Sequence, residues 1–245
     1  MNALKITVIT PCYNPGPCLE HCINSVISQS HNNIEYIVID GGSTDATLQI
    51  ISQYNSYVNF FVSEPDNGIY DAINKGIAKA TGDVIGVLNA DDVFASPDVL
   101  KEIADSFGKS GADVVYGNLN YINPKGGVIR RWRAGNGSFN WGWMPPHPTF
   151  YCRRELFEKF GAYRTDFGTA GDYELMLRMM HLNKVKAYHL DKVIVNMSLG
   201  GVSNRSISNR IKAWKNDHSA MRKNGVLFPL MAIIFKPLRK VFQYI

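Results

Sequence analysis

The fold is decided by nine residues, Val84-Ile85-Gly86-Val87-Leu88-Asn89-Ala90-Asp91-Asp92. The first five are continuously apolar, which is typical of a strand that is buried on both faces of a parallel sheet. The run then changes abruptly to polar and acidic residues. Because open parallel sheets bind their ligands where the strands end, this stretch predicts both a sheet and the edge at which a site lies.

Three other β-rich runs precede this stretch and alternate with helical patterns. The predicted strands are residues 5–10, 35–40, 58–63 and 83–89, and the predicted helices are residues 18–28, 44–54 and 71–80, the second with Ser43 or Thr44 as its N-cap. Beyond Asp92 we expect helices 97–106, 154–160 and 172–181, strands 113–116 and 147–152, a hairpin of 119–122 with 128–133, and one or two strands within 186–198. This alternation predicts an α/β fold with a mostly parallel central sheet flanked by helices.

The composition is that of a globular chain with a basic C-terminal segment. Of 245 residues, 45% are apolar and 19% are charged, which excludes a mainly disordered protein. Nine of the 26 Lys and Arg residues, but only one acid, fall within residues 204–245, so this segment carries +8 while residues 1–203 carry −3. A segment of this charge suits nucleic acid or an anionic membrane surface.

The cysteines and the N-terminus point to a reducing compartment. The four cysteines follow no metal-binding or CxxC spacing, so we expect ordinary buried thiols. Residues 1–10 show no signal-peptide pattern, and no apolar run reaches the roughly 20 residues that a membrane-spanning helix needs. These features predict a cytoplasmic protein.

The polar residues at the ends of the predicted strands suit a ligand site. Asp91 offers oxygen ligands for Mg²⁺ or Mn²⁺, which would neutralise the charge that develops on a diphosphate leaving group. Alternatively, Asp91 or Asp92 caps the following helix. Asp40 is placed to accept hydrogen bonds from a base or a ribose, and Gly41-Gly42 permits close approach of a ligand. Tyr13 either stacks on the base or packs against the protein.

Four motifs together resemble, in order and spacing, the family 2 glycosyltransferases with a GT-A fold, over about the first 200 residues. They are Ile9-Thr10-Pro11-Cys12-Tyr13-Asn14, Val38-Ile39-Asp40-Gly41-Gly42-Ser43-Thr44-Asp45, Asp66-Asn67-Gly68 and Leu88-Asn89-Ala90-Asp91-Asp92. The resemblance implies that a nucleotide-sugar donor is held by Thr10, Pro11, Tyr13, Asp40, Asp66, Gly68, Asn74, Asn89 and Ala90. It also implies that Asn89-Ala90-Asp91 is a DXD-type motif, with Asp91 as the main metal ligand and Mn²⁺ or Mg²⁺ as the cofactor.

Three positions depart from the family pattern. Asn89 replaces the first acid of the DXD-type motif, which keeps an oxygen but loses a charge, so we expect it on the ribose or sugar side. Ile73-Asn74 stands where many relatives have Arg-Asn. Gly171 replaces the first acid of the family's Glu-Asp-x-Asp/Glu-Leu segment, here Gly171-Asp172-Tyr173-Glu174-Leu175.

The second half of the chain has to supply a base and the acceptor site. Asp172 matches the family's general base, which takes the proton of the acceptor hydroxyl in an inverting transfer; alternatively, it only favours the N-terminus of its helix. Glu174 is predicted to orient the acceptor. His147 matches a family position that lines the diphosphate or the metal, although a structural His fits equally well. Trp143, on the aromatic loop 141–144, either contacts the acceptor or packs inside.

Residues 204–245 also combine basic residues with apolar and aromatic ones, which is typical of a helix or hairpin at a lipid interface. We expect this amphipathic extension to follow a GT-A domain of residues 1–203, with a nucleotide-binding half (1–95) and an acceptor half (96–203). Interfacial binding would place the enzyme on the inner face of the cell membrane. Packing against the domain or against a second subunit in a homo-oligomer is the alternative, and nucleic acid does not fit the apolar residues.

The sequence thus predicts an inverting, metal-dependent transferase of a sugar from a nucleotide-diphosphate sugar, with UDP favoured by the resemblance. The expected acceptor is a saccharide, carried on a polyprenyl diphosphate, in the assembly of bacterial surface polysaccharide. One alternative is a nucleotidyltransferase, although Asn14-Pro15-Gly16-Pro17 lacks the basic residues of its usual loop. Another is a non-catalytic nucleotide-sugar-binding or membrane-docking protein. An NAD-dependent oxidoreductase is disfavoured, because no GxGxxG motif follows a strand.

Overall fold

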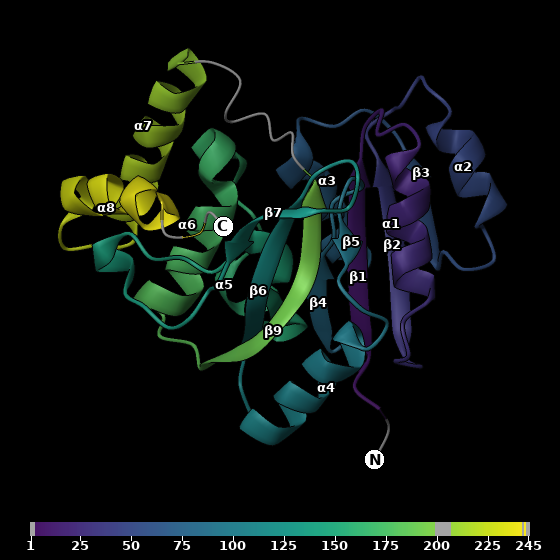
Figure 1. Ribbon diagram of the computed structural model, residues 1–245, viewed down its shortest axis with the longest axis horizontal. Coiled ribbons are helices and arrows are strands. Elements are labelled where there is room, and N and C mark those ends of the chain that lie inside the picture. The colour runs from purple at the N-terminus through teal and green to yellow at the C-terminus, as the bar shows by residue number, and fades with distance from the viewer. Residues whose placement is uncertain (1–2, 199–206, 242, 244–245) are drawn as a thin grey trace.

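The computed structural model describes residues 3–198, 207–241 and 243. Within them, nine strands form one sheet in the order β3-β2-β1-β4-β8-β6-β9-β5, with β7 paired to β6. The strands are β1 (Ile6–Cys12), β2 (Ile34–Asp40), β3 (Phe60–Ser63), β4 (Val84–Val87), β5 (Val93–Phe94), β6 (Val114–Ile122), β7 (Val128–Trp132), β8 (Tyr151–Arg153) and β9 (Ala187–Ser198). Strands β1 to β4 run parallel, whereas β8 runs antiparallel to β4 and β6, so the second half of the sheet is mixed (Figure 1).

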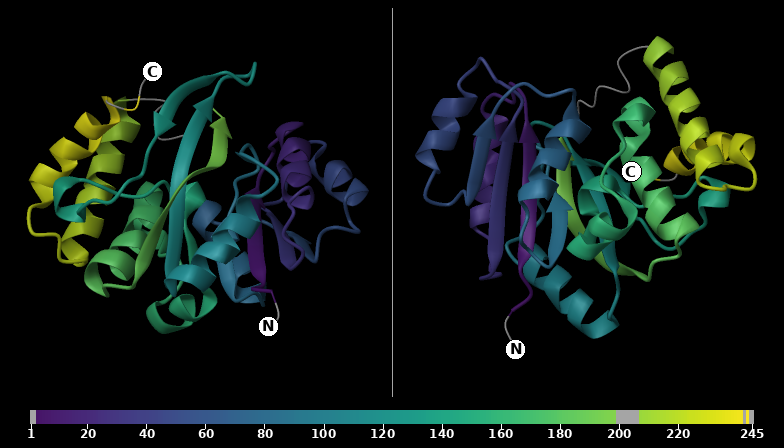
Figure 2. Two further views of the ribbon diagram at one scale, coloured as in Figure 1. Left: turned by 60° about the horizontal axis from the view of Figure 1, so that its bottom comes forward. Right: turned by 180° about the vertical axis from the view of Figure 1, so that it is seen from behind.

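Helices cover both faces of the sheet, as the two views of Figure 2 show. They are α1 (Cys18–Ile27), α2 (Thr47–Gln53), α3 (Ile69–Lys79), α4 (Val99–Ser110), α5 (Arg154–Phe160), α6 (Gly171–Met176), α7 (Ile207–Lys223) and α8 (Pro229–Val241). Because side chains alternate along a strand, Ile9 and Ile37 pack toward α3, α5 and α6, whereas Val8 and Tyr36 pack toward α1, α2 and α4. The predicted α/β fold with flanking helices is confirmed.

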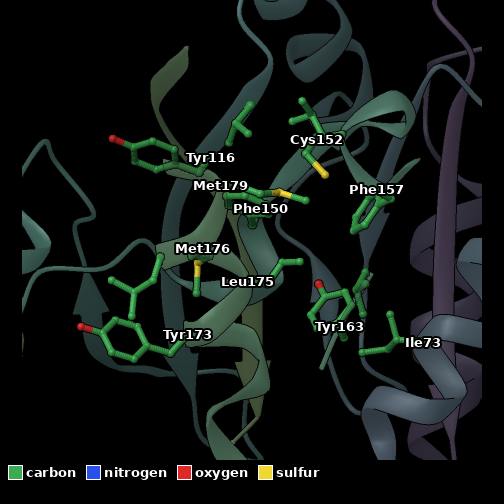
Figure 3. Packing of buried hydrophobic residues seen from close by; sticks show 14 of the residues in the cluster. Ile73, Tyr116, Phe150, Cys152, Phe157, Tyr163, Tyr173, Leu175, Met176 and Met179 are labelled. Atoms are coloured by element: carbon green, nitrogen blue, oxygen red, sulfur yellow. The ribbon is translucent and has the colours of Figure 1, made fainter. Parts of the chain in front are cut away.

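The core on the α3 side of the sheet joins α3 to α6 and to the segment that leads into it. Figure 3 shows Ile73 of α3 beside Tyr163, and Tyr173 beside Met176 of α6. All four side chains are buried, and burial of one such apolar side chain stabilises a fold by roughly 1.5–3 kcal/mol. The segment that leads into α6 is therefore fixed by packing against α3.

The C-terminal helices α7 and α8 belong to this same core. Ala220, Met221, Val226 and Ala232 are buried in the cluster that contains α6, and α7 and α8 pack against the 3₁₀ turns Thr165–Ala170 and Phe139–Trp141. The expected boundary between residues 203 and 204 lies outside the described residues. None of the helices in the described part of the chain combines the length and apolarity needed to cross a bilayer.

Two predicted elements are corrected near the site. The helix expected over 44–54 begins only at Thr47, without a side-chain N-cap, because the side chain of Ser43 donates to Asp40 instead. The strand expected over 147–152 is a 3₁₀ turn, His147–Thr149, followed by the short strand β8. Pro146 and Pro148 have no N–H to donate to a sheet, which explains the change.

Smaller corrections concern β6 and the cysteines. The two strands expected at 113–116 and 119–122 form one continuous strand, β6, which pairs with β7 as the predicted hairpin and in parallel with β9. Cys12, Cys22 and Cys152 are buried free thiols, as predicted, but Cys18 is exposed. Cys18 is the first residue of α1, where its side chain does not reach the core.

Candidate active site

The four strand ends named above meet at one edge of the sheet. The register pairs Cys12 of β1 with Asp40 of β2, and Asp40 with Ser63 of β3. Across the β1–β4 pair, the N–H of Leu88 donates to the carbonyl of Ile9 (3.0 Å). The segments that follow therefore leave the sheet side by side, and we call residues 12–16, 40–45, 63–68 and 89–92 the carboxyl edge.

Asp40 joins the segments of the carboxyl edge, because its carboxylate accepts hydrogen bonds from neighbouring protein groups. The residue is 0% exposed. Its Oδ2 accepts hydrogen bonds from the Ser63 hydroxyl (2.6 Å) and the Ser43 N–H (2.9 Å), and its Oδ1 accepts one from the Ser43 hydroxyl. Burial by itself raises the pKa of Asp40, but these hydrogen bonds outweigh burial, so the pKa lies below its ordinary value. Asp40 thus shapes the 40–45 loop, and its direct contact with the nucleotide stays a prediction.

Side chains tie the loops after β1 and β2 to each other. Asn14 has a left-handed backbone (φ 48°); its N–H donates to the Ser43 hydroxyl (2.8 Å), and its Oδ1 accepts from the Thr44 N–H (2.8 Å). The N–H of Gly16 donates to Asp45 (3.0 Å). Tyr13 projects from this tied loop with 65% of its surface exposed, so its ring is available for stacking on a ligand.

Asp66 approaches Tyr13 across Gly41. A Cβ atom at residue 41 would collide with Asp66 Oδ2 and would lie 3.5 Å from the Tyr13 ring, so this approach requires glycine. Asp66 Oδ1 accepts from the N–H of Gly68 (2.8 Å), and Gly68 (φ 107°) turns the chain into α3. The structure therefore brings Tyr13, Asp66 and Gly68 together, as the sequence predicts.

The acidic motif after β4 contains one exposed and one buried aspartate. Asp91 is exposed, whereas Asp92 is buried and accepts from the Asn89 side chain (3.1 Å) and the Ser198 N–H (3.3 Å). Burial, then the charge of Asp91, raises the pKa of Asp92 to about 7. Helix α4 has Asp98 at its N-cap, so neither acid caps it, and that alternative is wrong.

The same motif fits a divalent cation. Asn89 Oδ1 is buried and has no hydrogen-bond partner among the described residues, although buried polar atoms are rarely left unpaired. An oxygen of this kind beside two aspartates is the ligand type that Mg²⁺ or Mn²⁺ prefers. Within the described residues, no three His, Cys, Asp or Glu side chains form a metal-binding group, so an ion here would also need oxygens from a substrate.

Asp172, near the start of α6, is held from α3. Its Oδ1 accepts hydrogen bonds from the Tyr70 hydroxyl (3.1 Å) and from the Tyr173 N–H (2.7 Å). Tyr70 lies in the first turn of α3, two residues after Gly68, so this contact places Asp172 next to the carboxyl edge. Oδ2 of the half-buried Asp172 has no hydrogen bond to the described residues and is open to a ligand.

His147 and Asn74 support Tyr163. His147 Nε2 lies 2.8 Å from the Tyr163 hydroxyl, and the two rings pack edge to face. Asn74 accepts from the Tyr163 N–H (2.9 Å) and donates to its carbonyl (2.8 Å). Burial lowers the pKa of His147, and the charge of Asp172 opposes this effect. Among the described residues, no hydrogen bond or ion pair joins His147 to Asp91 or Asn74 to the tip of the carboxyl edge, and the bonds that both side chains do make support Tyr163.

Glu174 lies in the interior, which corrects its expected contact with the acceptor. It is 0% exposed and pairs with Arg178 (2.9 Å) and with Arg164 (3.2 Å). Asn224, at the end of α7, donates to the same carboxylate (3.3 Å). Glu174 therefore joins α6 to the C-terminal helices; two residues beyond Asp172, it points to a different side of the helix.

Trp143, Thr10, Pro11 and Ala90 are also interior residues. Trp143 is 5% exposed, donates its indole N–H to the carbonyl of Ala134 (2.8 Å) and packs against Tyr116 and Phe139, so its packing alternative holds and its contact with the acceptor is corrected. The Thr10 hydroxyl accepts from Tyr36 (3.2 Å), and Pro11 and Ala90 are buried. These last three residues shape the strand ends without presenting a side chain to a ligand.

Sequence reasoning missed two functional neighbours, Tyr70 and Ser63. Tyr70 lies inside the stretch Gly68–Gly76, whose departure from the family pattern drew attention to Ile73 instead. Ser63 closes β3, and only the register shows that it faces Asp40. Its position at a strand end was the one available signal.

Comparison with known sequences agrees with this geometry. The model of glycosyl transferase family 2 matches residues 7–176. An uncharacterised glycosyltransferase of Mycobacterium tuberculosis is 34% identical over 187 residues, which cover 72% of this chain and 69% of the relative. A PGL/p-HBAD biosynthesis glycosyltransferase of Mycobacterium bovis is 28% identical over 220 residues, which cover 83% of this chain and 81% of the relative.

Solved structures share the fold. Staphylococcus aureus TarS 1–349, in complex with UDP-GlcNAc, has a TM-score of 0.69 and 20% identity over 90% of this chain, which spans 66% of that fragment. The mannosyltransferase PcManGT of Pyrobaculum calidifontis, with GDP-Man and Mn²⁺, has a TM-score of 0.68 and 19% identity over 97% of this chain and 73% of its own. The chain is therefore a glycosyltransferase with a GT-A fold and belongs to glycosyl transferase family 2.

Proposed function

We propose that this enzyme is an inverting glycosyltransferase in which Asp172 is the general base. The observation that carries the proposal is the Asp172 carboxylate, held at Oδ1 and open at Oδ2, beside the edge that carries exposed Asp91. Oδ2 takes the proton of the acceptor hydroxyl while that oxygen attacks the anomeric carbon. The bond from this carbon to the diphosphate breaks, and the products are a glycoside of inverted configuration and a nucleoside diphosphate.

The donor is a nucleotide-diphosphate sugar, and we favour UDP. The exposed ring of Tyr13 can stack on a base, and the Asp66 carboxylate beside it can accept an N–H from the edge of that base. Both uracil and guanine offer such an N–H. TarS and PcManGT were solved with UDP-GlcNAc and GDP-Man, so the fold alone does not decide between them, and the resemblance to the family favours UDP.

Asp91 and the Asn89 Oδ1 are the residues that would hold Mn²⁺ or Mg²⁺, together with diphosphate oxygens. When bound, the ion neutralises the charge that grows on the departing diphosphate. PcManGT, whose structure holds Mn²⁺, supports this part of the proposal.

A donor screen tests the proposed reaction. UDP-, GDP- and dTDP-sugars are offered with saccharide acceptors, and the released nucleoside diphosphate is measured with Mn²⁺, with Mg²⁺ and with a chelator. We expect acceptor-dependent release from one class of donor, loss of release with the chelator, and loss of transfer in Asp172→Asn with nucleotide binding retained. Unaffected transfer in both Asp172→Asn and Asp91→Asn would reject the assignment. Nucleotide binding without turnover would favour a binding protein, and pyrophosphate release from a nucleoside triphosphate would favour a nucleotidyltransferase.

We further propose that the acceptor is a saccharide on polyprenyl diphosphate, in surface polysaccharide assembly at the inner face of the membrane. One side of α8 packs inward through Ala232, while the segment around it exposes large apolar side chains: Leu227, Phe228, Leu230, Met231, Ile234 and Leu238. Helices α7 and α8 also carry exposed basic residues: Lys212, Lys215, Arg222, Lys223 and Arg239. Apolar side chains next to basic ones suit an anionic bilayer surface.

Vesicle sedimentation tests the membrane proposal. Because Met221, Val226 and Ala232 are core residues, removal of residues 204–245 would disrupt the fold, so we choose the double substitution Leu230→Glu with Ile234→Glu. We expect wild-type protein to sediment with anionic vesicles and the double variant to lose most of this binding, whereas Leu182→Glu, at an exposed residue outside α7 and α8, retains it. Equal partitioning of all three proteins would reject the proposal, and a dimer that the double variant abolishes would favour a homo-oligomer.

A further inference from the structure

One departure from the family pattern, Gly171, lies against Tyr70 of α3 in the structure. Gly171 lies under the ring of Tyr70: a Cβ atom at residue 171 would lie 2.7 Å from Tyr70 Cε2 and 3.0 Å from the carbonyl oxygen of Arg164. Real Cβ atoms essentially never lie closer than 3.0 Å to another heavy atom, so a side chain at residue 171 would displace the Tyr70 ring. The Tyr70 ring can therefore take this position only because residue 171 is glycine.

The ring of Tyr70 is fixed independently of Asp172. It stacks on Tyr163, with centroids 5.6 Å apart and planes 11° from parallel. Tyr163 is in turn held by two backbone hydrogen bonds to Asn74 and by His147. Aromatic stacking of this kind is favourable beyond burial alone, so the position of the Tyr70 hydroxyl is set before any ligand arrives.

The Tyr70 hydroxyl acts as a donor toward Asp172, because the Asp172 carboxylate and the Thr169 carbonyl within hydrogen-bond distance are both acceptors. Burial, then the charge of Asp172, raises the pKa of Tyr70, so the hydroxyl keeps its proton. It lies 3.1 Å from Asp172 Oδ1 and 3.2 Å from the carbonyl oxygen of Thr169. A hydroxyl has one proton to donate, and an ionised carboxylate is a stronger acceptor than a carbonyl. While Asp172 is ionised, the proton of Tyr70 therefore lies toward Oδ1.

We propose that Tyr70 is the positioning residue of the general base: its hydroxyl and the Tyr173 N–H hold Oδ1 of Asp172, so that Oδ2 faces the acceptor hydroxyl. This inference rests on the proposed role of Asp172. In this arrangement a residue of α3, in the expected nucleotide-binding half, orients a base that lies in the expected acceptor half. Gly171 is part of the device, because only glycine leaves room for the ring.

Tyr70→Phe tests the proposal, because it keeps the stack on Tyr163 and removes only the hydroxyl. We expect kcat to fall roughly 10- to 50-fold, since a hydrogen bond to a charged group is lost, while KM for the donor stays unchanged. We also expect the acid limb of the profile of kcat/KM against pH to move to higher pH, because a carboxylate that loses a donor holds its proton more tightly. A merely structural role for Tyr70 would not move this limb.

Two further variants make the outcome decisive. Tyr54→Phe removes a hydroxyl that also donates to a carboxylate, that of Glu20 (3.0 Å), far along the chain from Asp172, and should leave kcat and the pH profile unchanged. Gly171→Ala keeps the hydroxyl but displaces the ring, and should lower kcat at least as much as Tyr70→Phe. Wild-type kcat and pH profile in a folded Tyr70→Phe variant would overturn this inference alone, whereas full activity of Asp172→Asn would overturn the proposed base as well.

Discussion

In the carboxyl edge and in the segment 161–174, two acids with opposite surroundings can be compared. At the carboxyl edge, Asp40 is buried with both oxygens occupied by protein donors, whereas Asp91 is exposed. In the segment 161–174, Glu174 is buried and bound to Arg178, whereas Asp172 keeps one oxygen open. Protein donors on both oxygens stabilise the ionised form of a buried acid and fix its position, whereas an acid with an unbonded oxygen is better placed to take up a proton or a ligand.

Neighbours that are distant in sequence create this difference. Asp40 accepts a hydrogen bond from Ser63 of β3, Glu174 from Asn224, just after α7, and Asp172 from Tyr70 of α3. The motif around each acid supplies some of its partners, but it does not contain these distant ones. Substitution of the open and the occupied acids should therefore separate effects on catalysis from effects on stability.

The largest effect should come from the open acids. We expect Asp172→Asn to lower kcat roughly 10³-fold, because a general base contributes about 10²- to 10⁴-fold, with the free energy of unfolding changed by less than about 1 kcal/mol, since the amide oxygen of Asn can still accept from Tyr70 and Tyr173. Steady-state release of nucleoside diphosphate and urea unfolding measure the two quantities. Asp105→Asn, at an exposed residue of α4, is the matched control and should change neither. A loss of stability in Asp172→Asn well above this limit would contradict the distinction between open and occupied acids.

The next largest effect should be a loss of stability when Glu174, the occupied acid of the segment 161–174, is substituted. Glu174→Gln leaves Arg178, which is only 4% exposed, without its charged partner, and we expect a loss of about 3 kcal/mol in the free energy of unfolding, since breaking a buried ion pair costs about 3–5 kcal/mol. The kcat of the folded variant should stay within a few-fold of wild type. Chemical unfolding at neutral pH measures the loss.

Glu158→Gln gives the matched control for this substitution. Glu158 pairs with Arg154 at the same spacing of four residues, but its side chain is 62% exposed, so we expect a change below about 0.5 kcal/mol. Equal losses in the two variants would mean that burial does not set the strength of these ion pairs.

The sequence predicted the fold well where local patterns decide it. Continuous apolar runs such as Val84–Val87 marked the parallel strands, and the polar residues after them marked the carboxyl edge. Prediction from the sequence fails where a distant partner overrides a local pattern. Ser43 looks like a helix N-cap, but Asp40 takes its hydroxyl. Glu174 and Trp143 look available in the sequence, but α7 and the aromatic cluster around Tyr116 bury them.

A third effect tests whether occupied acids away from the site behave in the same way. Glu35, at the opposite end of β2, accepts from the Thr7 hydroxyl (2.6 Å) and the Thr81 N–H (2.7 Å) and pairs with Lys5 (3.0 Å). Burial raises the pKa of Glu35, but these donors outweigh burial and lower the pKa from 4.5 to about 2. At 1.36 kcal/mol for each pH unit, this difference is worth about 3 kcal/mol at most.

The sign of that difference predicts its pH dependence. A folded-state pKa below the unfolded one stabilises the protein above about pH 4.5, and the stabilisation disappears as the pH falls toward 2. Glu35→Gln should therefore be less stable than wild type at pH 7 by up to about 3 kcal/mol, and the gap should close between pH 5 and pH 2. Urea unfolding over this pH range measures it, and a gap that is constant with pH would contradict the ionic origin of the stabilisation.

The smallest effect separates support from reaction within the carboxyl edge itself. In Asp40→Asn one oxygen can still accept from Ser43, but the charge is gone, so we expect a loss of about 2 kcal/mol in the free energy of unfolding. Because the pKa of Asp40 is lowered in the fold, this loss should be largest at neutral pH and should shrink at acidic pH. The loosened 40–45 loop should raise KM for the donor several-fold, while kcat at saturating donor stays close to wild type. A fall in kcat as large as that of Asp172→Asn would mean that Asp40 takes part in the reaction despite its occupied oxygens.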